Sequence, residues 1–299
     1  IARARAHFTA GIAHAHASGL RLRDPLSEVG RTGFYLAYHA ADDRKLAEAL
    51  ASFYLAACPE LAWRAPHVGE TRGPGPIRLA LVSNYFHGHT IGRLNRGLIE
   101  HLSRERFHVT LFTTAHQDDE ERRALFAAAD RTVEMPNDLA RARAAIAATR
   151  PDILYYTDIG MAPLTYFLAF ARLAAVQCVA WGHPDTTGIP NLDYFLSCEA
   201  MEPEGAEAHY SEKLVRLPGP TVHWSPPSFA APLKNPFKER AALGLPEDAH
   251  LYVCPQTVFK FHPDFDAVLV EILRRDPAGR LVLVKSWDTH LDRLLRERL

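Results

Sequence analysis

The sequence predicts an α/β protein whose main part is a doubly wound parallel sheet. Short and almost continuously apolar runs, such as residues 77–83, alternate with longer stretches of helical periodicity. Runs that are apolar throughout are typical of parallel strands buried on both faces. Because strands and helices alternate, the strands are expected to be joined by right-handed crossovers. The 299 residues correspond to about two domains, enough for a core without disulfides or a structural metal.

Three segments are expected along the chain. Residues 1–70 form a helical leader, because apolar residues recur at steps of three and four, and a Gly- and Pro-rich linker ends it. Residues 77–236 form a first Rossmann-like half, and residues 238–299 form the start of a second, incomplete one. The expected strands are 77–83, 107–113, 132–135, 153–156, 176–181, 252–254 and 281–284, with short β-like pieces at 194–197 and 213–217. The expected helices of the two halves are 91–102, 119–129, 139–149, 163–172, 263–274 and one from 289 onward.

Composition excludes several classes of protein. Lys plus Arg number 34 and Asp plus Glu number 35, so the basic surplus of a nucleic-acid-binding protein is missing. The most apolar stretch, residues 159–181, is interrupted by Pro163 and Arg172, so no membrane-spanning helix is expected. The 4 cysteines are scattered without a C-x-x-C pair, which predicts buried free thiols and a cytoplasmic protein. The chain begins at Ile1 and stops within an expected helix, so we expect a segment of a longer protein.

The first candidate site is the loop after the first expected strand. In open α/β sheets ligands bind beyond the carboxyl ends of the strands, and residues 83–90 occupy such a place just before a helix. His87 or His89 can hold an imidazole beside a reacting group while the helix N–H groups face an anion. Two alternatives remain open: loop histidines without a function, and an H-x-H metal pair, which lacks a third ligand at a fitting spacing.

The second candidate site, residues 181–190, also follows an expected strand. Its two Gly, two Pro and two Thr residues predict tight turns with exposed N–H and hydroxyl groups, which suit a phosphate or a sugar. The candidate binding residues are Thr186, Thr187 and Gly188. The alternative is a turn without a ligand.

The third candidate site, residues 254–263, follows the first strand of the second half. Lys260 lies between apolar residues beside a helix start, where it can neutralise a diphosphate; the alternative is a lysine that reaches into solvent. The D-x-D tripeptide at 264–266 lies at a helix start, where interaction with the helix dipole is favoured over metal binding. Neither the P-loop pattern nor G-x-G-x-x-G between a strand and a helix is present.

These loops, taken together and in order, resemble the catalytic region of the O-linked N-acetylglucosamine transferases, glycosyltransferase family 41, in its bacterial branch. The most specific strings are W-G-H-P-D-T-T-G at 181–188 and Y-S-E-K-L-V-R-L-P at 210–218. The other matching segments are 77–83 with His89, 151–154, Asp193-Tyr194, and C-P-Q at 254–256 followed by K-F-H-P at 260–263.

The resemblance implies a GT-B architecture of two Rossmann-like halves, and an inverting transfer that uses no metal and no other cofactor. His89 matches the cleft histidine that acts as the base or lies beside it. Lys260 matches the lysine that neutralises the UDP diphosphate, and Gln256 lies in the same donor-binding loop. The leader would connect to tetratricopeptide-like repeats. In the family further uridine contacts come from later strands than this chain has, so the isolated chain is expected to be nearly inactive.

The sequence thus predicts an enzyme that moves a sugar, GlcNAc, from a UDP-sugar to Ser or Thr hydroxyls of proteins, with no nucleic acid or membrane partner. An alternative within the family is a relative that uses UDP-glucose or attaches the sugar to Asn. A second alternative is a non-catalytic helical-repeat scaffold with a degenerate transferase domain. A third is a GT-B-like sugar-nucleotide epimerase.

Overall fold

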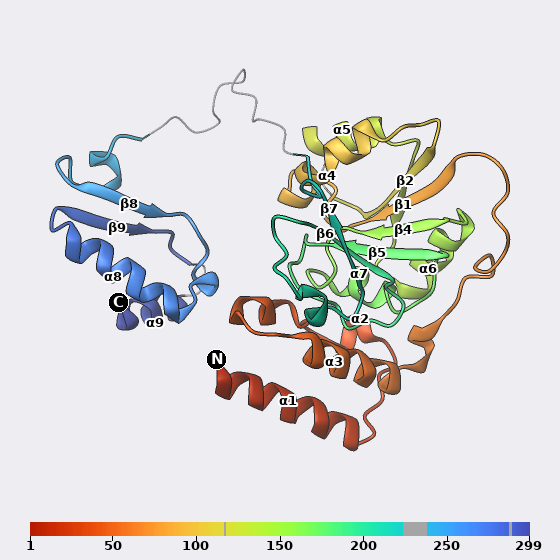
Figure 1. Ribbon diagram of the computed structural model, residues 1–299, viewed down its shortest axis with the longest axis horizontal. Helices are drawn as coiled ribbons and strands as arrows, with labels where there is room; N and C mark the ends of the chain where they lie inside the picture. The colour runs from red at the N-terminus through yellow and green to blue at the C-terminus, as the bar shows by residue number, and fades with distance from the viewer. Residues whose placement is uncertain (117, 224–237, 287–288) are drawn as a thin grey trace. The chain divides into compact units, whose positions relative to one another are not determined.

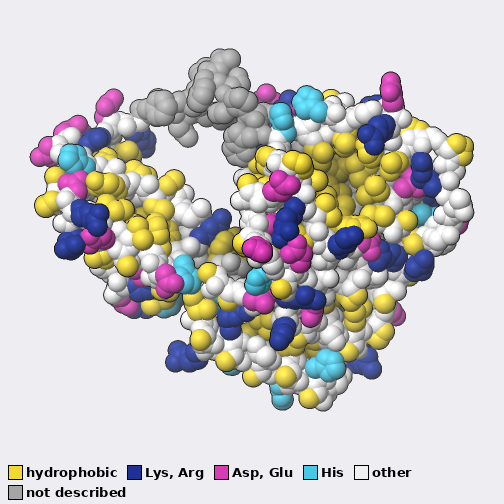
Figure 2. Space-filling view, in the orientation of Figure 1, with side chains coloured by type: hydrophobic (Ala, Val, Ile, Leu, Met, Phe, Trp, Pro, Cys, Tyr) yellow, Lys and Arg dark blue, Asp and Glu magenta, His cyan; other side chains and the backbone are white. Residues whose placement is uncertain are grey.

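The chain consists of two compact units, one large and one small (Figure 1). The computed structural model describes residues 1–116, 118–223, 238–286 and 289–299. The first unit comprises Ile1–Ala37 and Ala41–Pro226, and the second comprises Tyr38–Ala40 and Pro227–Leu299. On the face shown in Figure 2, basic and acidic side chains are interspersed, as expected for a chain with a net charge of −1.

The first unit is built on a seven-stranded sheet in which all strands are parallel. The strands are β1 (Ile77–Val82), β2 (Phe107–Thr114), β3 (Arg131–Met135), β4 (Ile153–Tyr156), β5 (Val176–Ala180), β6 (Tyr194–Cys198) and β7 (Lys213–Leu217). Their spatial order is β3-β2-β1-β4-β5-β6-β7, which reverses direction between β1 and β4. This order confirms the doubly wound α/β fold. The two short pieces expected around residues 194 and 213 are full strands of the same sheet.

Helices cover both faces of this sheet. The helices between its strands are α4 (Thr90–His101), α5 (Glu120–Ala128), α6 (Leu139–Ala148) and α7 (Pro163–Leu168). Alternate residues of β1 point to opposite faces: Leu81 packs in the core that includes Leu125 of α5, and Val82 packs in the core that includes Phe167 of α7. Central strands such as β1 are therefore buried from both sides, which explains their nearly continuous apolar runs.

Apart from Tyr38–Ala40, the helical leader is part of the first unit, in which it packs on the α6–α7 face. Its elements are α1 (Ala2–Ala17), α2 (Pro25–Glu28), η1 (Phe34–His39), α3 (Arg44–Ala57) and η2 (Pro59–Ala62). The ring of Tyr54 on α3 makes an edge contact with Phe167, at 5.1 Å between centroids. The guanidinium of Arg143 on α6 donates to the carbonyl oxygens of Glu60 and Leu61, at 3.0 and 3.3 Å. The leader thus shares a core with the sheet.

The second unit contains a parallel pair of strands, β8 (His250–Cys254) and β9 (Gly279–Leu283). Its helical elements are η4 (Ala241–Leu243), η5 (Val258–Lys260), η6 (Pro263–Phe265), α8 (Asp266–Arg275) and α9 (Thr289–Arg298). Its core consists of Val258, Phe261, Leu269 and Leu295. The helix expected at 263–274 is thus a 3-10 turn followed by α8. Of the helices that the structure describes, none is both long and apolar enough to cross a membrane; the cytoplasmic location stays a prediction.

Candidate functional site

The candidate site of the first unit lies at the edge of the sheet where the strands end, here called the carboxyl edge. The strand order changes direction between β1 and β4. The helices that follow these two strands pack on opposite faces of the sheet, so the loops after β1 and β4 diverge at this edge. The loop after β1 carries His87 and His89, the loop after β4 begins with Thr157 and Asp158, and the loop after β5 begins with Trp181. The fold therefore brings two of the three predicted loops to one edge.

His89 is the N-cap residue of α4, and this position determines which ring nitrogen is free. Its Nδ1 accepts a hydrogen bond from the backbone N–H of Ile91 at 3.2 Å, and its ring stacks on Tyr85 with 4.4 Å between centroids. Burial, followed by the nearby charges of His87 and Arg93, lowers the pKa of His89. A neutral imidazole that accepts at Nδ1 carries its proton on Nε2. His89 is therefore set up as a hydrogen-bond donor through Nε2–H.

Asp158 is a buried acid at the same edge and is not among the residues predicted from the sequence. It is 0 % exposed, and its Oδ1 accepts a hydrogen bond from the Thr157 hydroxyl at 3.3 Å. Burial raises the pKa of Asp158 to about 7, against hydrogen bonds from Ser83 and Thr157 that lower it. Its only signal in the sequence is a single acidic residue soon after a buried strand.

Several buried polar atoms at the carboxyl edge have no protein partner. Within the described part of the chain they are Asn84 Oδ1, His87 Nε2, Asp158 Oδ2, Trp181 Nε1 and His183 Nδ1. They come from the loops that follow β1, β4 and β5. Because buried polar atoms are almost always hydrogen-bonded, such a concentration of free donors and acceptors is typical of a place that holds water or a polar ligand.

The turn at Thr186, Thr187 and Gly188 differs from the expected exposed loop. Both threonine side chains are buried, and their hydroxyls donate to the carboxylate of Glu212, that of Thr186 at 2.7 Å. The N–H of Thr187 also donates to Glu212, at 2.9 Å, and the N–H of Gly188 donates to the hydroxyl of Ser211 at 3.0 Å. These groups hold the loop together within the protein. Direct contact of the three residues with a ligand stays a prediction.

Gly188 also packs the turn against the helical leader. Its φ of +69° is in the left-handed region, and an added Cβ would lie 2.2 Å from the carbonyl carbon of Ala47 on α3. Only glycine fits such a close approach of two backbones. Helix α3 therefore fixes the position of the loop after β5.

Two acids and a histidine lie in the same loop region. The carboxyl group of Asp185 is hydrogen-bonded to that of Asp43, the residue before α3, and Asp43 is also ion-paired with Arg5 of α1. Burial and the charge of Asp43 raise the pKa of Asp185. The ring of His183 stacks on Phe34 at 4.7 Å between centroids, and burial lowers the pKa of His183 to about 4, so this imidazole is neutral.

The remaining predicted residues belong to the second unit. Gln256 and Lys260 are exposed in the segment after β8, and the buried Val258 and Phe261 anchor that segment in the core of the unit. In the D-x-D tripeptide, Asp266 is ion-paired with Arg298 at 2.7 Å. Among the residues that the structure describes, no three His, Cys, Asp or Glu side chains gather as a metal site.

Known proteins are similar to this chain in sequence and in structure, although no protein-family model matches it. It is 31% identical over 114 residues to a probable UDP-N-acetylglucosamine–peptide N-acetylglucosaminyltransferase, SEC, of Arabidopsis thaliana, covering 38% of this chain and 12% of the relative. It is 34% identical over 123 residues to a UDP-glucose:protein N-beta-glucosyltransferase of Actinobacillus pleuropneumoniae, covering 41% of this chain and 19% of the relative. The resemblance to the O-linked N-acetylglucosamine transferases and their relatives is confirmed.

The structure of one such transferase shows the same fold. A mutant O-GlcNAc transferase of Thermobaculum terrenum superposes with a TM-score of 0.70 at 23% identity, covering 89% of this chain and 51% of that chain. The Rossmann-like α/β fold of these glycosyltransferases is thereby confirmed for this chain. The chain spans about half of that structure and less than a fifth of the two curated relatives.

The acid pair predicts a specific pH dependence of stability. Because the folded-state pKa of Asp185 is raised, its protonated form stabilises the fold at low pH, and this contribution is lost as the pH rises above about 4. An Asp185→Asn variant keeps the hydrogen bonds without the charge. We expect its free energy of unfolding to exceed that of the unaltered chain by about 1 kcal/mol or more at pH 8, with the difference vanishing near pH 4.

Urea denaturation at a series of pH values measures this difference. Asp118→Asn, which removes an exposed carboxylate paired with the exposed Arg123, is the matched control and should change stability little at any pH. A difference for Asp185→Asn that is constant from pH 4 to 8 would contradict the raised pKa.

The packing of the turn on α3 predicts a large effect of one methyl group. Gly188→Ala combines left-handed strain with the collision at Ala47, and we expect it to lower the free energy of unfolding by more than about 2 kcal/mol. Gly205→Ala is the control, because Gly205 has a φ of +78° but open space around its added Cβ. Equal losses in the two variants, measured by urea denaturation, would show that the contact with α3 contributes nothing.

Proposed function

We propose that the protein containing this chain transfers a sugar, GlcNAc, from a UDP-sugar to Ser or Thr hydroxyls of proteins. The names of its relatives support a UDP-sugar donor and a protein acceptor. The observation that carries the proposal is His89 at the start of α4, on the edge of the sheet where unpartnered polar atoms gather. The proposed cytoplasmic location rests on the cysteines, of which Cys58, Cys178 and Cys198 are buried and all four are free.

The proposed reaction is an inverting displacement at the anomeric carbon. The acceptor oxygen forms a bond to that carbon and gives up its proton to water, while the bond to the diphosphate oxygen breaks and its electron pair leaves with the diphosphate, so negative charge develops there. His89 assists through its Nε2–H as a donor to the reacting groups. It could accept a proton on Nε2 only after its Nδ1 releases the N–H of Ile91, because a neutral imidazole carries one proton.

The donor is proposed to be bound without a metal. Lys260 supplies the positive charge for the diphosphate, and Gln256 supplies polar contacts from the same segment after β8. Both side chains are exposed in their own unit, where Lys260 Nζ lies 5.4 Å from the centroid of the Tyr38 ring. Thr186, Thr187 and Gly188 are proposed to serve the donor site by holding the loop after β5 in place, since their polar groups bond to Glu212 and Ser211.

A second candidate function is transfer of glucose from UDP-glucose to Asn. It is favoured by the similarity to the N-beta-glucosyltransferase of Actinobacillus pleuropneumoniae, which has the higher identity of the two curated relatives described above. The residues of the first unit serve either reaction, because both displace a diphosphate from an anomeric carbon.

The test is sugar transfer by the full-length protein, measured by mass spectrometry of acceptor peptides that contain Ser, Thr or Asn, with UDP-GlcNAc or UDP-glucose as the donor. His89→Asn retains an N-cap oxygen for the N–H of Ile91 but removes Nε2–H. We expect kcat/KM to fall by about 100-fold in this variant and in Lys260→Met, with unfolding unchanged.

Two substitutions of exposed residues are the controls. His7→Asn on α1 and Lys45→Met on α3 make the same chemical changes away from the proposed site and should leave transfer unaltered. Full activity of His89→Asn and Lys260→Met would overturn the site assignment. Absence of transfer from either donor would favour the non-catalytic scaffold instead.

A further inference from the structure

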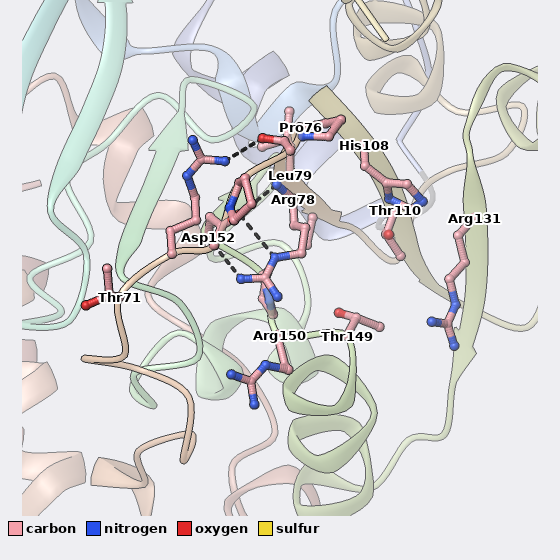
Figure 3. Close-up of a pocket in the computed structure, with 16 residues that line it drawn as sticks. Thr71, Pro76, Arg78, Leu79, His108, Thr110, Arg131, Thr149, Arg150 and Asp152 are labelled. Carbon is pink, nitrogen blue, oxygen red and sulfur yellow. Dashed lines mark hydrogen bonds and ion pairs between the residues drawn. The ribbon is translucent and has the colours of Figure 1, made fainter. Parts of the chain in front are cut away.

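A second, strongly basic pocket lies at the opposite edge of the seven-stranded sheet, where the strands begin (Figure 3). This amino-edge pocket has a volume of about 410 Å³ and is formed by the linker at 71–76, the first residues of β1, β2 and β3, and the segment 149–152. Its lining contains none of the residues of the carboxyl-edge site.

The basic side chains that line the pocket outnumber the acidic ones. Four arginines and His108 line the pocket, and Asp152 is the only acid among its lining residues. Arg78 donates three hydrogen bonds to the carboxylate of Asp152: Nη2 and Nε donate at 2.6 and 3.1 Å, and the backbone N–H donates at 2.8 Å. These bonds hold the pKa of Asp152 below its usual range, so the pair contributes no net charge.

Of the other three arginines, Arg150 is ion-paired with Glu70, and both side chains are half-exposed. The surplus charge is therefore that of Arg72 and Arg131. Arg72 donates to the carbonyl oxygen of Gly75 at 2.7 Å. In the described part of the chain, neither Arg72 nor Arg131 has an acidic side chain within ion-pair distance. Figure 3 shows that Arg78, Arg131 and Arg150 come from separate segments of the chain.

The surplus positive charge favours binding of an anion because it lies on a concave surface. Like charges that line a concave surface repel one another and together attract an anion. The planar guanidinium group matches the oxygens of a phosphate through paired hydrogen bonds. Pro74, Pro76 and Leu79 add an apolar wall against which a ring can lie, and the volume is within the range of small-molecule sites, about 300–1,000 Å³.

We propose that the amino-edge pocket binds a phosphate-bearing small molecule of nucleotide size. Arg72 and Arg131 bind its phosphate groups, and the proline-rich linker contacts its ring. The pocket is independent of the proposed sugar transfer. It lies where the strands begin, whereas the loops that carry His89 and the Thr186–Gly188 turn lie where the strands end.

The test is calorimetric titration of the full chain, at low ionic strength, with pyrophosphate, ADP and adenosine. Pyrophosphate and ADP should bind and adenosine should not; a tighter Kd for ADP than for pyrophosphate shows the contribution of the ring. The double variant Arg72→Gln/Arg131→Gln should weaken binding of both anions by at least about tenfold. Arg131→Gln alone should show part of this loss without affecting the bond of Arg72 to the linker.

The matched control is Arg123→Gln/Arg141→Gln, which removes the same charge at exposed positions outside the pocket. It should leave both Kd values unchanged. All titrations are repeated in the Lys260→Met background, which removes the proposed diphosphate contact of the second unit, so that the binding that remains belongs to the pocket. The proposal is overturned if Kd in this background exceeds about 1 mM for both anions, or if the control weakens binding as much as the pocket variant.

Discussion

The buried carboxylate of Glu212 holds together the parts of the first unit that carry the candidate site. It is 5% exposed and accepts three hydrogen bonds from the side chains of Thr186 and Thr187 and the N–H of Thr187. A buried carboxylate is tolerated when its oxygens are occupied in this way, and losing such partners leaves a costly uncompensated charge. The turn fixed by Glu212 places Gly188 against α3. The loop after β5, strand β7 and the leader are therefore mutually dependent.

The same contact joins the two distant strings on which the resemblance to the family mainly rests. The W-G-H-P-D-T-T-G run ends in the turn, and the Y-S-E-K run contributes Ser211 and Glu212, which hold that turn. The buried threonine hydroxyls of the first string and the buried carboxylate of the second are each other's hydrogen-bond partners. Without the other string, these buried groups would have no partner. The leader enters this network through Asp43, which faces Asp185 and is ion-paired with Arg5.

The sequence predicts the order of strands and helices well because central strands such as β1 and β4 are buried on both faces and are nearly continuous apolar runs. It predicts β6 and β7 only as short pieces, since β7 at the edge of the sheet carries Lys213 and Arg216. The position of His89 at a strand end is also predictable. Its free nitrogen is not, because that depends on the direction of the Ile91 N–H. The burial of Asp158 depends likewise on a loop that starts more than 70 residues earlier, at Ser83.

The carboxyl and amino edges of the sheet differ in the sign of the helix-dipole charge that lies there. This difference explains why cationic side chains line the amino edge. Helix α4 begins at the carboxyl edge, where its N–H groups favour an anion, so a neutral His89 and few cations suffice there. At the amino edge α6 ends, and the negative end of its dipole repels an anion; Thr149 and Arg150, which line the pocket, follow it directly. Attraction of a phosphate at this edge therefore has to come from side chains. Two of the four arginines that line this pocket are ion-paired, Arg78 with Asp152 and Arg150 with Glu70, so the charge that can attract a phosphate there is that of Arg72 and Arg131.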